Sequence, residues 1–363
     1  MKILHVIGGM DRGGAESYIM NTLRNIDRKK YQCDILTFLK PRDGEKYFYE
    51  DELKELGVKI IQIDDDRFKK PIKFMKNVER VLVSGKYDAI HSHIDFMSAL
   101  TLRAARNAGL KKRISHSHNT DNSNLKKPLL KAASNVFRRQ INREATLCLA
   151  CGEEAGKFLY GAKQDFRVIH NGINLQQFRY NSNTRKMMRA KLGIDDSATV
   201  LLNVGRFEEQ KNQEHLIDIF ADYARKNKTA KLVIIGEGSL RQNLENKIAS
   251  ERLGDSVYLL SAQDSIERFY SMSDIFVLPS LFEGVPTVGI EAQANGMKCL
   301  FSDNVPEETK LLDSAEFLSL KDNWTSRIKI AEEKRGDAIN NPKVQEYAIE
   351  NTVKALEKAY DEA

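Results

Sequence analysis

Short runs of apolar residues recur along the chain, separated by stretches of mixed polarity. In the first half, runs of strand length lie at 2–7, 33–38, 58–61, 87–91, 113–116, 146–149 and 166–169. In the second half they lie at 199–204, 231–235, 257–260, 275–278 and 298–301. Several runs are apolar at nearly every position, which is typical of strands that are covered on both faces.

Longer stretches between these runs have the length and spacing of helices, among them 45–56, 72–84, 212–226 and 239–250. Strands that alternate with helices predict an α/β fold, in which doubly wound parallel sheets carry helices on both faces. The alternation stops in an Asn-rich segment at 171–198 and starts again at 199. We therefore expect a first domain at 1–180 and a second at 198–341. Open sheets bind ligands at the carboxyl ends of their strands, so two facing sheets would form a cleft between domains.

Composition adds limits to this interpretation. The chain has 363 residues, of which 41% are hydrophobic and 30% charged, a balance that favours packed domains over disorder. No apolar run approaches the roughly 18 residues that a membrane-spanning helix needs. Four cysteines are too few for a disulfide scaffold in a chain of this length, so we expect a reducing, cytoplasmic location.

The two halves differ in charge. Residues 1–180 carry 33 basic and 21 acidic side chains, a net charge of +12, whereas the remainder carries 24 and 30, a net charge of −6. Within 103–143 there are eleven basic residues and a single acidic one, Asp121. Different net charges indicate domains that face different surroundings or partners.

Two loops contain candidate binding residues. Arg206 and Lys211 lie between a buried strand and a helix, where cations and free helix N–H groups can hold a phosphate, although a solvated loop fits the spacing equally well. The segment 279–291 contains Glu283 just before a helix expected to run from Pro286 to about 296, with Glu291 inside it. These carboxylates suit the hydroxyls of a sugar attached to a phosphate. The alternative makes Glu283 a partner of the helix dipole and Glu291 a surface charge.

A set of motifs in a fixed order extends these observations. It consists of Gly13-Gly14-Ala15-Glu16, Asn171-Gly172-Ile173-Asn174, Gly205-Arg206 with Lys211, Gly236-Glu237-Gly238, and Pro279-Ser280 through Glu291-Ala292. The set resembles family 4 of the retaining glycosyltransferases that have the GT-B fold. Glu283 and Glu291 match the family's E-x7-E motif, whereas Asn174 replaces its usual Asp. The resemblance covers most of the chain and weakens after about residue 304. The helix-like sequence near 342–360 is similar to the terminal helix that crosses back to the first domain in this fold, so the resemblance implies that residues 342–363 join that domain.

The resemblance implies roles for individual residues. Arg206 and Lys211 would bind the donor diphosphate, Glu291 the ribose, and Glu283 the transferred sugar. Main-chain groups around Gly284 would assist Glu283, and Gly14 would let the backbone approach the diphosphate. The base would lie near Ser261-Ala262-Gln263. The complete set of implied donor-binding residues is Gly13, Gly14, Gly205, Arg206, Lys211, Gly236, Ala262, Gln263, Glu283, Gly284, Val285, Pro286, Thr287 and Glu291.

Histidines and cysteines raise the question of a metal. His91-Ser92-His93 and His116-Ser117-His118 both end predicted strands, and residues two apart share a strand face. No carboxylate or thiolate joins them in the sequence, and the resembling family generally needs no metal, so we expect neither a metal nor a cofactor. His118 best matches the family's catalytic histidine that faces the donor sugar, with His116 as the alternative. The pair Cys148 and Cys151 fits small residues of a buried strand.

A basic stretch at 124–143 predicts a helix with an apolar stripe that includes Val136 and Phe137. Such a helix could lie on an anionic membrane surface or pack on its own domain. The resemblance implies a glycosyltransferase of exopolysaccharide or capsule synthesis that uses a nucleotide-sugar, UDP-linked by preference, and a glycan or lipid-linked acceptor. The alternatives are a UDP-sugar epimerase of the same fold, a silent scaffold and a nucleic-acid-binding protein. The last lacks a known motif, so we expect no nucleic-acid partner.

Overall fold

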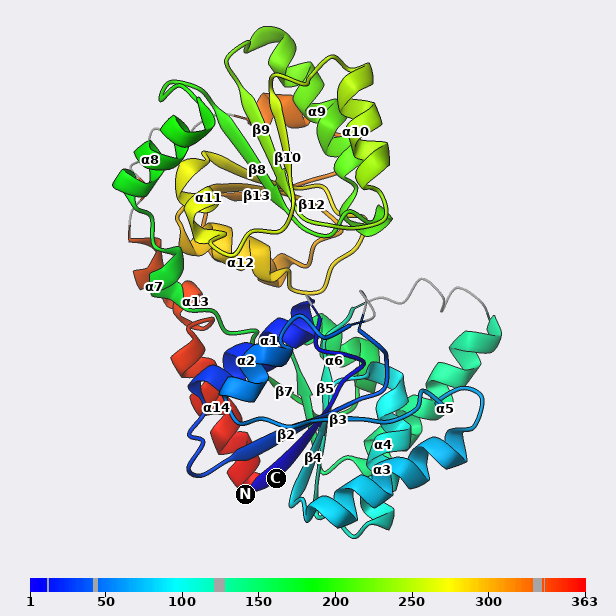
Figure 1. Ribbon diagram of the computed structural model, residues 1–363. Helices are drawn as coiled ribbons and strands as arrows, with labels where there is room; N and C mark the ends of the chain where they lie inside the picture. Colours follow the sequence, from blue (N-terminus) through cyan, green and yellow to red (C-terminus); the bar gives the residue numbers. More distant parts are fainter. Residues whose placement is uncertain (12, 42–44, 121–127, 329–334, 336) are drawn as a thin grey trace. The chain divides into compact units, whose positions relative to one another are not determined.

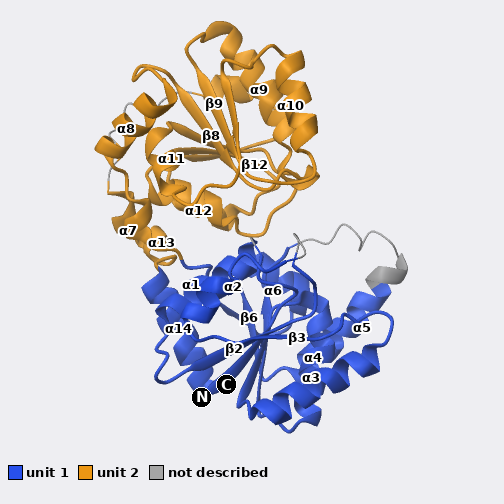
Figure 2. Ribbon diagram, viewed as in Figure 1, with its two compact units in different colours: residues 1–172, 349–363 blue, residues 173–348 orange. Residues whose placement is uncertain are grey.

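The computed structural model describes the chain except for residues 12, 42–44, 121–127, 329–334 and 336, and except for the side chains of residues 128–131. It consists of two compact units, one formed by residues 1–172 and 349–363 and the other by residues 173–348 (Figure 2). The sequence predicts the domain boundary between residues 180 and 198. The structure changes unit earlier, between Gly172 and Ile173, because helices α7 (Leu175–Phe178) and α8 (Ser182–Leu192) bury side chains in the core of the second unit.

The first unit contains a seven-stranded parallel sheet in the order β3-β2-β1-β4-β5-β6-β7 (Figure 1). The strands are β1 (Lys2–Val6), β2 (Gln32–Thr37), β3 (Ile60–Gln62), β4 (Ala89–Ser92), β5 (Lys112–Ser117), β6 (Leu147–Ala150) and β7 (Arg167–Val168). Each overlaps a run predicted from the sequence. The predicted parallel sheet is therefore confirmed for this half of the chain.

Helices cover both faces of this sheet because successive strand residues point to opposite sides. On one face, Ile3 packs with apolar residues of α1 (Gly14–Asn25), α2 (Glu50–Glu55) and α14 (Ile349–Glu362). On the other, Leu4 packs with residues of α3 (Pro71–Gly85), α4 (Ser98–Asn107), α5 (Pro128–Glu144) and α6 (Glu153–Tyr160). The helix expected at 45–56 begins later, at Glu50, after a buried Tyr47 that packs on the first face.

The second unit repeats the architecture with six parallel strands in the order β10-β9-β8-β11-β12-β13. The strands are β8 (Val200–Val204), β9 (Lys231–Ile235), β10 (Val257–Leu260), β11 (Ile275–Leu278), β12 (Lys298–Ser302) and β13 (Ala315–Leu318). The sequence analysis missed β13, which has only four residues and includes a charged one, Glu316. Its carboxylate pairs with Lys298 of the neighbouring strand at 2.9 Å, so the charge is stabilised by a partner that local sequence does not reveal.

Helices again lie on both faces of the second sheet (Figure 1). One face carries α9 (Gln213–Lys226) and α10 (Arg241–Ser250); the other carries α11 (Glu267–Met272), α12 (Thr287–Ala294), α7, α8 and α13 (Pro342–Gln345). Short 3₁₀ turns lie at η1 (Asp95–Met97), η3 (Glu209–Lys211), η4 (Glu307–Thr309), η5 (Trp324–Arg327) and η6 (Ala338–Asn340).

The C-terminal region differs from the single helix expected near 342–360. It forms α13 and α14, with a break at residues 346–348. At the break, the Tyr347 carbonyl accepts a hydrogen bond from the Ile173 N–H at 2.9 Å, and Ile173 forms a β-bridge with Ala348. The second unit therefore ends on a short pairing between its first and last residues, and α14 then packs on the first sheet through Val353 and Leu356.

Candidate functional site

Two loops of the second unit leave neighbouring strands at the point where the strand order reverses. The loop 205–212 follows β8 and the loop 279–286 follows β11, and β8 pairs with both β9 and β11. In open parallel sheets the loops at such a switch point form the ligand site, because they diverge to opposite faces of the sheet. The residues that the sequence singled out on these loops are thus brought to one edge of the sheet.

Hydrogen bonds join the two loops directly. The Leu281 N–H donates to the Gln210 carbonyl at 2.8 Å, and the Asn212 side-chain amide donates to the Pro279 carbonyl at 3.0 Å. The Gln210 amide also donates to the Phe282 carbonyl at 3.0 Å. Asn212 adopts a left-handed conformation, with φ of 53°, which turns the chain from the loop into α9. The two loops therefore form one connected structure.

An ion pair lies at the centre of this structure. The Lys211 Nζ lies 2.6 Å from the Glu283 Oε1, and the Ser280 hydroxyl donates to the same oxygen at 2.6 Å. Both charged side chains are largely buried, with exposed fractions of 12% for Lys211 and 6% for Glu283. Gly205 leaves room for the lysine, since a Cβ there would lie 3.2 Å from Lys211 Cδ. The structure thus places one cation and one hydrogen-bond acceptor side by side at the switch point of the sheet.

Arg206 lies on the same loop and is exposed. Among the described residues, no ion pair is formed by its guanidinium, so its charge is available to an anion. The loop is held in place by Phe207, whose side chain is fully buried and whose N–H donates to the Glu237 carbonyl at 2.8 Å. Gly236 is required by this packing, because a Cβ there would lie 2.0 Å from the Gly205 carbonyl oxygen.

The loop after β11 leads into α12. This helix begins at Thr287 and ends at Ala294, one residue later and two residues earlier than expected, because Pro286 has an extended conformation and acts as the cap. Val285 and Pro286 are buried, so Val285 can contribute to a site only through its main chain. Gly284 and Thr287 are partly exposed beside Glu283. The first N–H groups of α12 therefore lie next to the carboxylate in the chain.

Glu291, one turn into α12, accepts a hydrogen bond from the Tyr270 hydroxyl at 2.7 Å. Burial raises the pKa of the Glu291 carboxyl to about 7, while the bond from Tyr270 acts in the opposite direction. Tyr270 lies in α11, and sequence reasoning did not single it out because nothing in the local pattern separates it from other core tyrosines. Ala262 and Gln263 follow β10, two strands away from β8, and Gln263 is exposed.

The implied donor-binding residues of the first unit lie at the start of α1. Gly13 caps this helix and Gly14 is its first residue, directly after the loop that leaves β1. A Cβ on Gly14 would meet no atom within 4 Å, so this backbone is open to an approaching group, whereas a Cβ on Gly13 would collide with the Glu16 carboxylate. Their proposed contact with a diphosphate stays a prediction, as does the cleft between the two domains.

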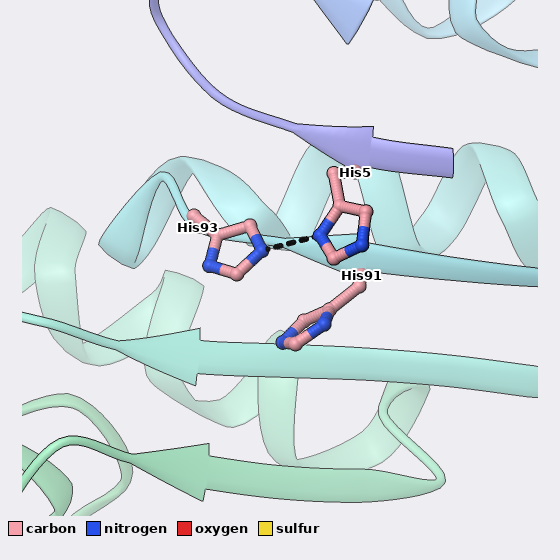
Figure 3. Close-up of side chains that lie close together, drawn as sticks. All are labelled: His5, His91 and His93. Atoms are coloured by element: carbon pink, nitrogen blue, oxygen red, sulfur yellow. Dashed lines mark hydrogen bonds between the residues drawn. The ribbon is translucent and has the colours of Figure 1, made fainter. Parts of the chain in front are cut away.

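Five histidines gather at the carboxyl ends of β1, β4 and β5. We call His5, His91, His93, His116 and His118 the histidine cluster. His5 pairs in register with His91, and β4 pairs with β5, so all five rings reach one face of the sheet. Nitrogens of neighbouring rings lie 3.0 Å apart for His5 and His93, 2.9 Å for His93 and His118, and 3.2 Å for His91 and His116. Figure 3 shows the His5 and His93 rings pointing at each other.

Burial keeps this cluster neutral. It lowers the pKa of His5 to about 4 and that of His118 to about 3, and it also lowers the pKa values of the other three. Two groups of three rings have nitrogens close enough to share one ion, namely His5 with His91 and His93, and His93 with His116 and His118. From the sequence we singled out only the two His-x-His pairs and missed His5. The available signal was that His5 lies inside another predicted buried strand, at 2–7.

The basic stretch at 124–143 forms α5 from Pro128 onwards, and residues 124–127 lie outside the described part. Phe137 packs on the domain core, in line with one of the two alternatives, but Val136 is 60% exposed and does not join the predicted stripe. Arg138 turns inward and donates to the Phe158 carbonyl at 2.8 Å. Part of the predicted basic surface is thus used in packing. In the part of the chain that the structure describes, no helix has the length and apolar character needed to cross a membrane.

Comparisons with known families and proteins agree on one class. Residues 184–354 match the family described as Glycosyl transferases group 1, and residues 12–177 match Glycosyltransferase Family 4. A glycosyltransferase of Bacillus subtilis named EpsF is 35% identical over 315 residues, which cover 85% of this chain and 80% of EpsF. The capsular polysaccharide biosynthesis glycosyltransferase CapH of Staphylococcus aureus is 26% identical and covers 99% of this chain and 98% of its own.

A third relative has a more specific name. The UDP-Gal:alpha-D-GlcNAc-diphosphoundecaprenol alpha-1,3-galactosyltransferase of Escherichia coli is 28% identical over 64% of this chain and 62% of its own length. Among solved structures, that of HepE from Anabaena in complex with UDP superposes with a TM-score of 0.81 at 16% identity, covering both chains fully. Sucrose-phosphate synthase of Thermosynechococcus elongatus gives 0.79 at 18% identity, covering 100% of this chain and 98% of its own. These two likenesses confirm the predicted fold.

Proposed function

Because the chain belongs to the glycosyl transferases group 1 family and is a glycosyltransferase, we propose that it moves a sugar from a UDP-sugar to an acceptor hydroxyl and retains the anomeric configuration. A role in polysaccharide synthesis is supported by the name of the relative CapH, a capsular polysaccharide biosynthesis glycosyltransferase. The observation that supports the proposal is the pairing of Lys211 with Glu283, because it sets a buried cation beside a carboxylate that could accept hydrogen bonds from sugar hydroxyls at the sheet's switch point.

UDP as the donor nucleotide is supported by two names. The E. coli relative is named for UDP-Gal, and the HepE structure contains UDP. In this chain, Glu291 would accept hydrogen bonds from the two ribose hydroxyls, and Tyr270 would hold its carboxylate in place. Ala262 and Gln263 would lie along the base.

The diphosphate would bind to Lys211 and Arg206. The Lys211 ammonium has three N–H donors, of which one is directed at Glu283, so two remain for diphosphate oxygens. Arg206 adds a planar set of donors from the exposed side of the loop. We propose that these two cations and the N–H groups of α12 replace a divalent ion at the diphosphate. The donor site would then need no metal or cofactor.

Transfer would occur on one face of the sugar. The acceptor oxygen bonds to the anomeric carbon while the bond from that carbon to the diphosphate oxygen breaks, and the acceptor proton passes to the departing oxygen. Negative charge grows on the diphosphate during this step, so Arg206 and Lys211 would stabilise the transition state more than the bound donor. Glu283 would orient the sugar through its hydroxyls, and His118 would donate to the sugar from the first unit.

The acceptor is proposed to be a glycan or a lipid-linked glycan, because the E. coli relative is named for a diphosphoundecaprenol acceptor. A lipid-linked acceptor brings the enzyme to a membrane surface. The net charge of +12 on residues 1–180 would favour an anionic leaflet. Cytoplasmic location with peripheral membrane contact follows from this proposal.

A panel of UDP-, GDP-, ADP- and dTDP-sugars tests the donor assignment by thermal shift. A true donor present at 100 times its Kd stabilises the fold by about 2.7 kcal/mol. Stabilisation by UDP-sugars alone is the expected result, and selective stabilisation by another nucleotide class would contradict it. The stabilising sugar is then incubated with enzyme and no acceptor. Conversion to an epimer under that condition would favour the epimerase alternative over transfer.

A further inference from the structure

We propose that His93, His116 and His118 bind one divalent transition-metal ion at the carboxyl ends of β4 and β5. These three rings have nitrogens close enough to share an ion. Imidazole is a preferred ligand of zinc and of other late first-row metals. The proposal departs from the sequence analysis, which expected no metal in the chain. It concerns the first unit and shares His118 with the proposed donor site, where the ring would donate to the sugar through Nδ1 while Nε2 binds the ion.

The hydrogen bonds of the histidine cluster distinguish this group from the other. Both ring nitrogens of His91 already have partners, since Nδ1 lies 2.7 Å from the Tyr360 hydroxyl and Nε2 lies 3.2 Å from His116 Nδ1. An ion held by His5, His91 and His93 would have to break one of these contacts. Each group contains at least one buried ring nitrogen with no hydrogen-bond partner among the described residues, His5 Nε2 in the first and His116 Nε2 in the second. Both nitrogens of His93 also have partners, so an ion in the second group replaces the contact between His93 and His118. It breaks no contact of His116 Nε2, and we therefore assign the ion to this group.

A single choice of tautomers accounts for the contacts around such an ion. His116 would donate from Nδ1 to His91 Nε2 and bind the ion through Nε2. His93 would donate from Nε2 to His5 Nδ1, 3.0 Å away, and bind through Nδ1. His118 would bind through Nε2. His93 and His116 thus each donate a hydrogen bond from the ring nitrogen that does not bind the ion. Such a bond to a second group fixes the orientation of metal-bound histidines in proteins.

The distances fit the same arrangement. Two nitrogens bound to one tetrahedral zinc ion at about 2.0 to 2.1 Å lie about 3.3 Å apart. His93 Nδ1 and His118 Nε2 are 2.9 Å apart, and ligand nitrogens of the three rings lie within 4.8 Å of one another, so the rings would rotate and move slightly to bind a shared ion. Without an ion, this contact is a hydrogen bond between rings, and the buried His116 Nε2 is left unsatisfied. Such an unsatisfied buried group is destabilising, so an ion bound to it would remove this cost as well as add bonds.

Burial determines how an ion would reach the site, and the charge of the ligands determines what else the ion could bind. His93 and His116 are buried and His118 is less so, which makes the His118 side the path of entry. Within the described residues, only histidines belong to the two close groups. Three neutral ligands leave the ion's charge of +2 uncompensated and one tetrahedral position open. That position would take an anionic or hydroxyl oxygen at the end of the sheet where ligands of this fold class bind.

Co²⁺ and Zn²⁺ test the proposal directly. Tag-free protein is dialysed against each ion, bound metal is counted by mass spectrometry, and the Co²⁺ form is examined by visible absorption for tetrahedral coordination. We expect one ion per chain. His116→Gln and His118→Gln should each weaken binding at least about 100-fold, whereas His5→Gln, which removes a partner of a ligand, should weaken it about tenfold. His215→Gln, outside the histidine cluster, is the matched control and should leave binding unchanged.

Two results would overturn the proposal. One is wild-type protein that retains no more ion than His116→Gln. The other is loss of the ion in His5→Gln together with full retention in His116→Gln, which would assign it to the other group. Thermal unfolding and UDP calorimetry accompany each variant, and His118→Gln decides the matter if His116→Gln fails to fold. Failure of wild-type protein to bind UDP would count against the proposed donor and not against the metal site.

Discussion

The loops after β8 and β11 in the second unit carry charged side chains, whereas β1 and β4, the corresponding strands of the first unit, end in imidazoles. The two sheets have the same order around their switch points, and both gather polar groups at the same edge. In the second unit, Lys211 and Glu283 keep their charges because each neutralises the other. In the first, no ion pair among the described residues involves the rings, and burial lowers the pKa of each histidine.

This difference shows that a shared topology supplies the position of a site and not its chemistry. Cations beside a carboxylate, with helix N–H groups nearby, suit an anionic sugar donor. Neutral imidazoles with available lone pairs suit a metal ion or each other. Each unit can therefore be tested by a change that should affect its own site and leave the other intact.

Removal of Lys211 should have the largest effect. Lys211→Ala takes away the buried cation proposed to face the leaving diphosphate, and loss of one such contact costs about 3 kcal/mol in the transition state. We expect turnover of the UDP-sugar to fall by roughly 100- to 1000-fold. Steady-state kinetics measure it, with Lys226→Ala, an exposed lysine at the end of α9, as the control. Equal turnover in the two variants would remove Lys211 from the site.

Charge reversal in the basic segment should weaken membrane binding strongly. Each lysine near an anionic surface contributes about 1 kcal/mol, so the triple change of Lys126, Lys127 and Lys131 to Glu should lower vesicle binding about 100-fold at low salt. Sedimentation with phosphatidylserine vesicles measures it, and wild-type binding should fall as salt rises. UDP affinity should not change, because none of these three lysines is assigned a contact with the donor. If wild-type protein did not bind these vesicles at low salt, the basic segment would have no role in membrane binding.

Substitution of the two glutamates should affect the affinities for UDP and for UDP-sugar differently. Glu283→Gln should weaken the intact UDP-sugar about tenfold more than UDP, since Glu283 is proposed to contact only the sugar, and a charged acceptor is worth roughly 1.5 to 3 kcal/mol. Glu291→Gln should weaken UDP and UDP-sugar alike. Isothermal calorimetry with both ligands distinguishes the roles. Thermal unfolding measures how much stability the protein loses when Lys211 no longer has its ionic partner. Equal losses in Glu283→Gln would place this residue elsewhere.

UDP binding should depend on pH through Glu291. The pKa of this carboxyl is raised to about 7, and ribose hydroxyls donate best to the ionised form. Binding therefore favours the carboxylate, and affinity should fall several-fold as pH drops from 8 to 6. Glu291→Gln should lose this component while keeping the part that comes from titration of UDP itself. If wild-type protein and Glu291→Gln showed the same pH dependence of UDP affinity, ionisation of Glu291 would not contribute to UDP binding.

Chelation should have the smallest effect on the donor site. EDTA should leave UDP affinity unchanged, because the proposed partners of the diphosphate are Arg206, Lys211 and helix N–H groups. The same treatment should strip any ion from the histidine cluster, so the two units respond differently. Calorimetry before and after chelation measures the first response, and metal analysis measures the second. Loss of UDP binding that Mn²⁺ or Mg²⁺ restores would contradict the metal-free donor site.

The sequence by itself was sufficient to predict the alternating strands and helices. Buried parallel strands such as 231–235 are apolar at nearly every position, and this pattern is local. The charged loop residues were also visible, because Arg206, Lys211 and Glu283 lie directly after such strands. The break at 346–348 and strand β13 were not predictable, since both depend on partners far away in the sequence.

Tertiary structure decided which of these residues meet. Lys211 and Glu283 are 72 residues apart, and only the adjacency of β8 and β11 brings them to 2.6 Å. In the same way, the placement of β1 beside β4 joins His5 to histidines more than 80 residues away. Tyr270 reaches Glu291 because α11 packs beside α12, and burial there raises the carboxyl pKa. Hydrophobic periodicity records which side of an element is buried, but strand order and burial of charge arise only when the whole chain has folded.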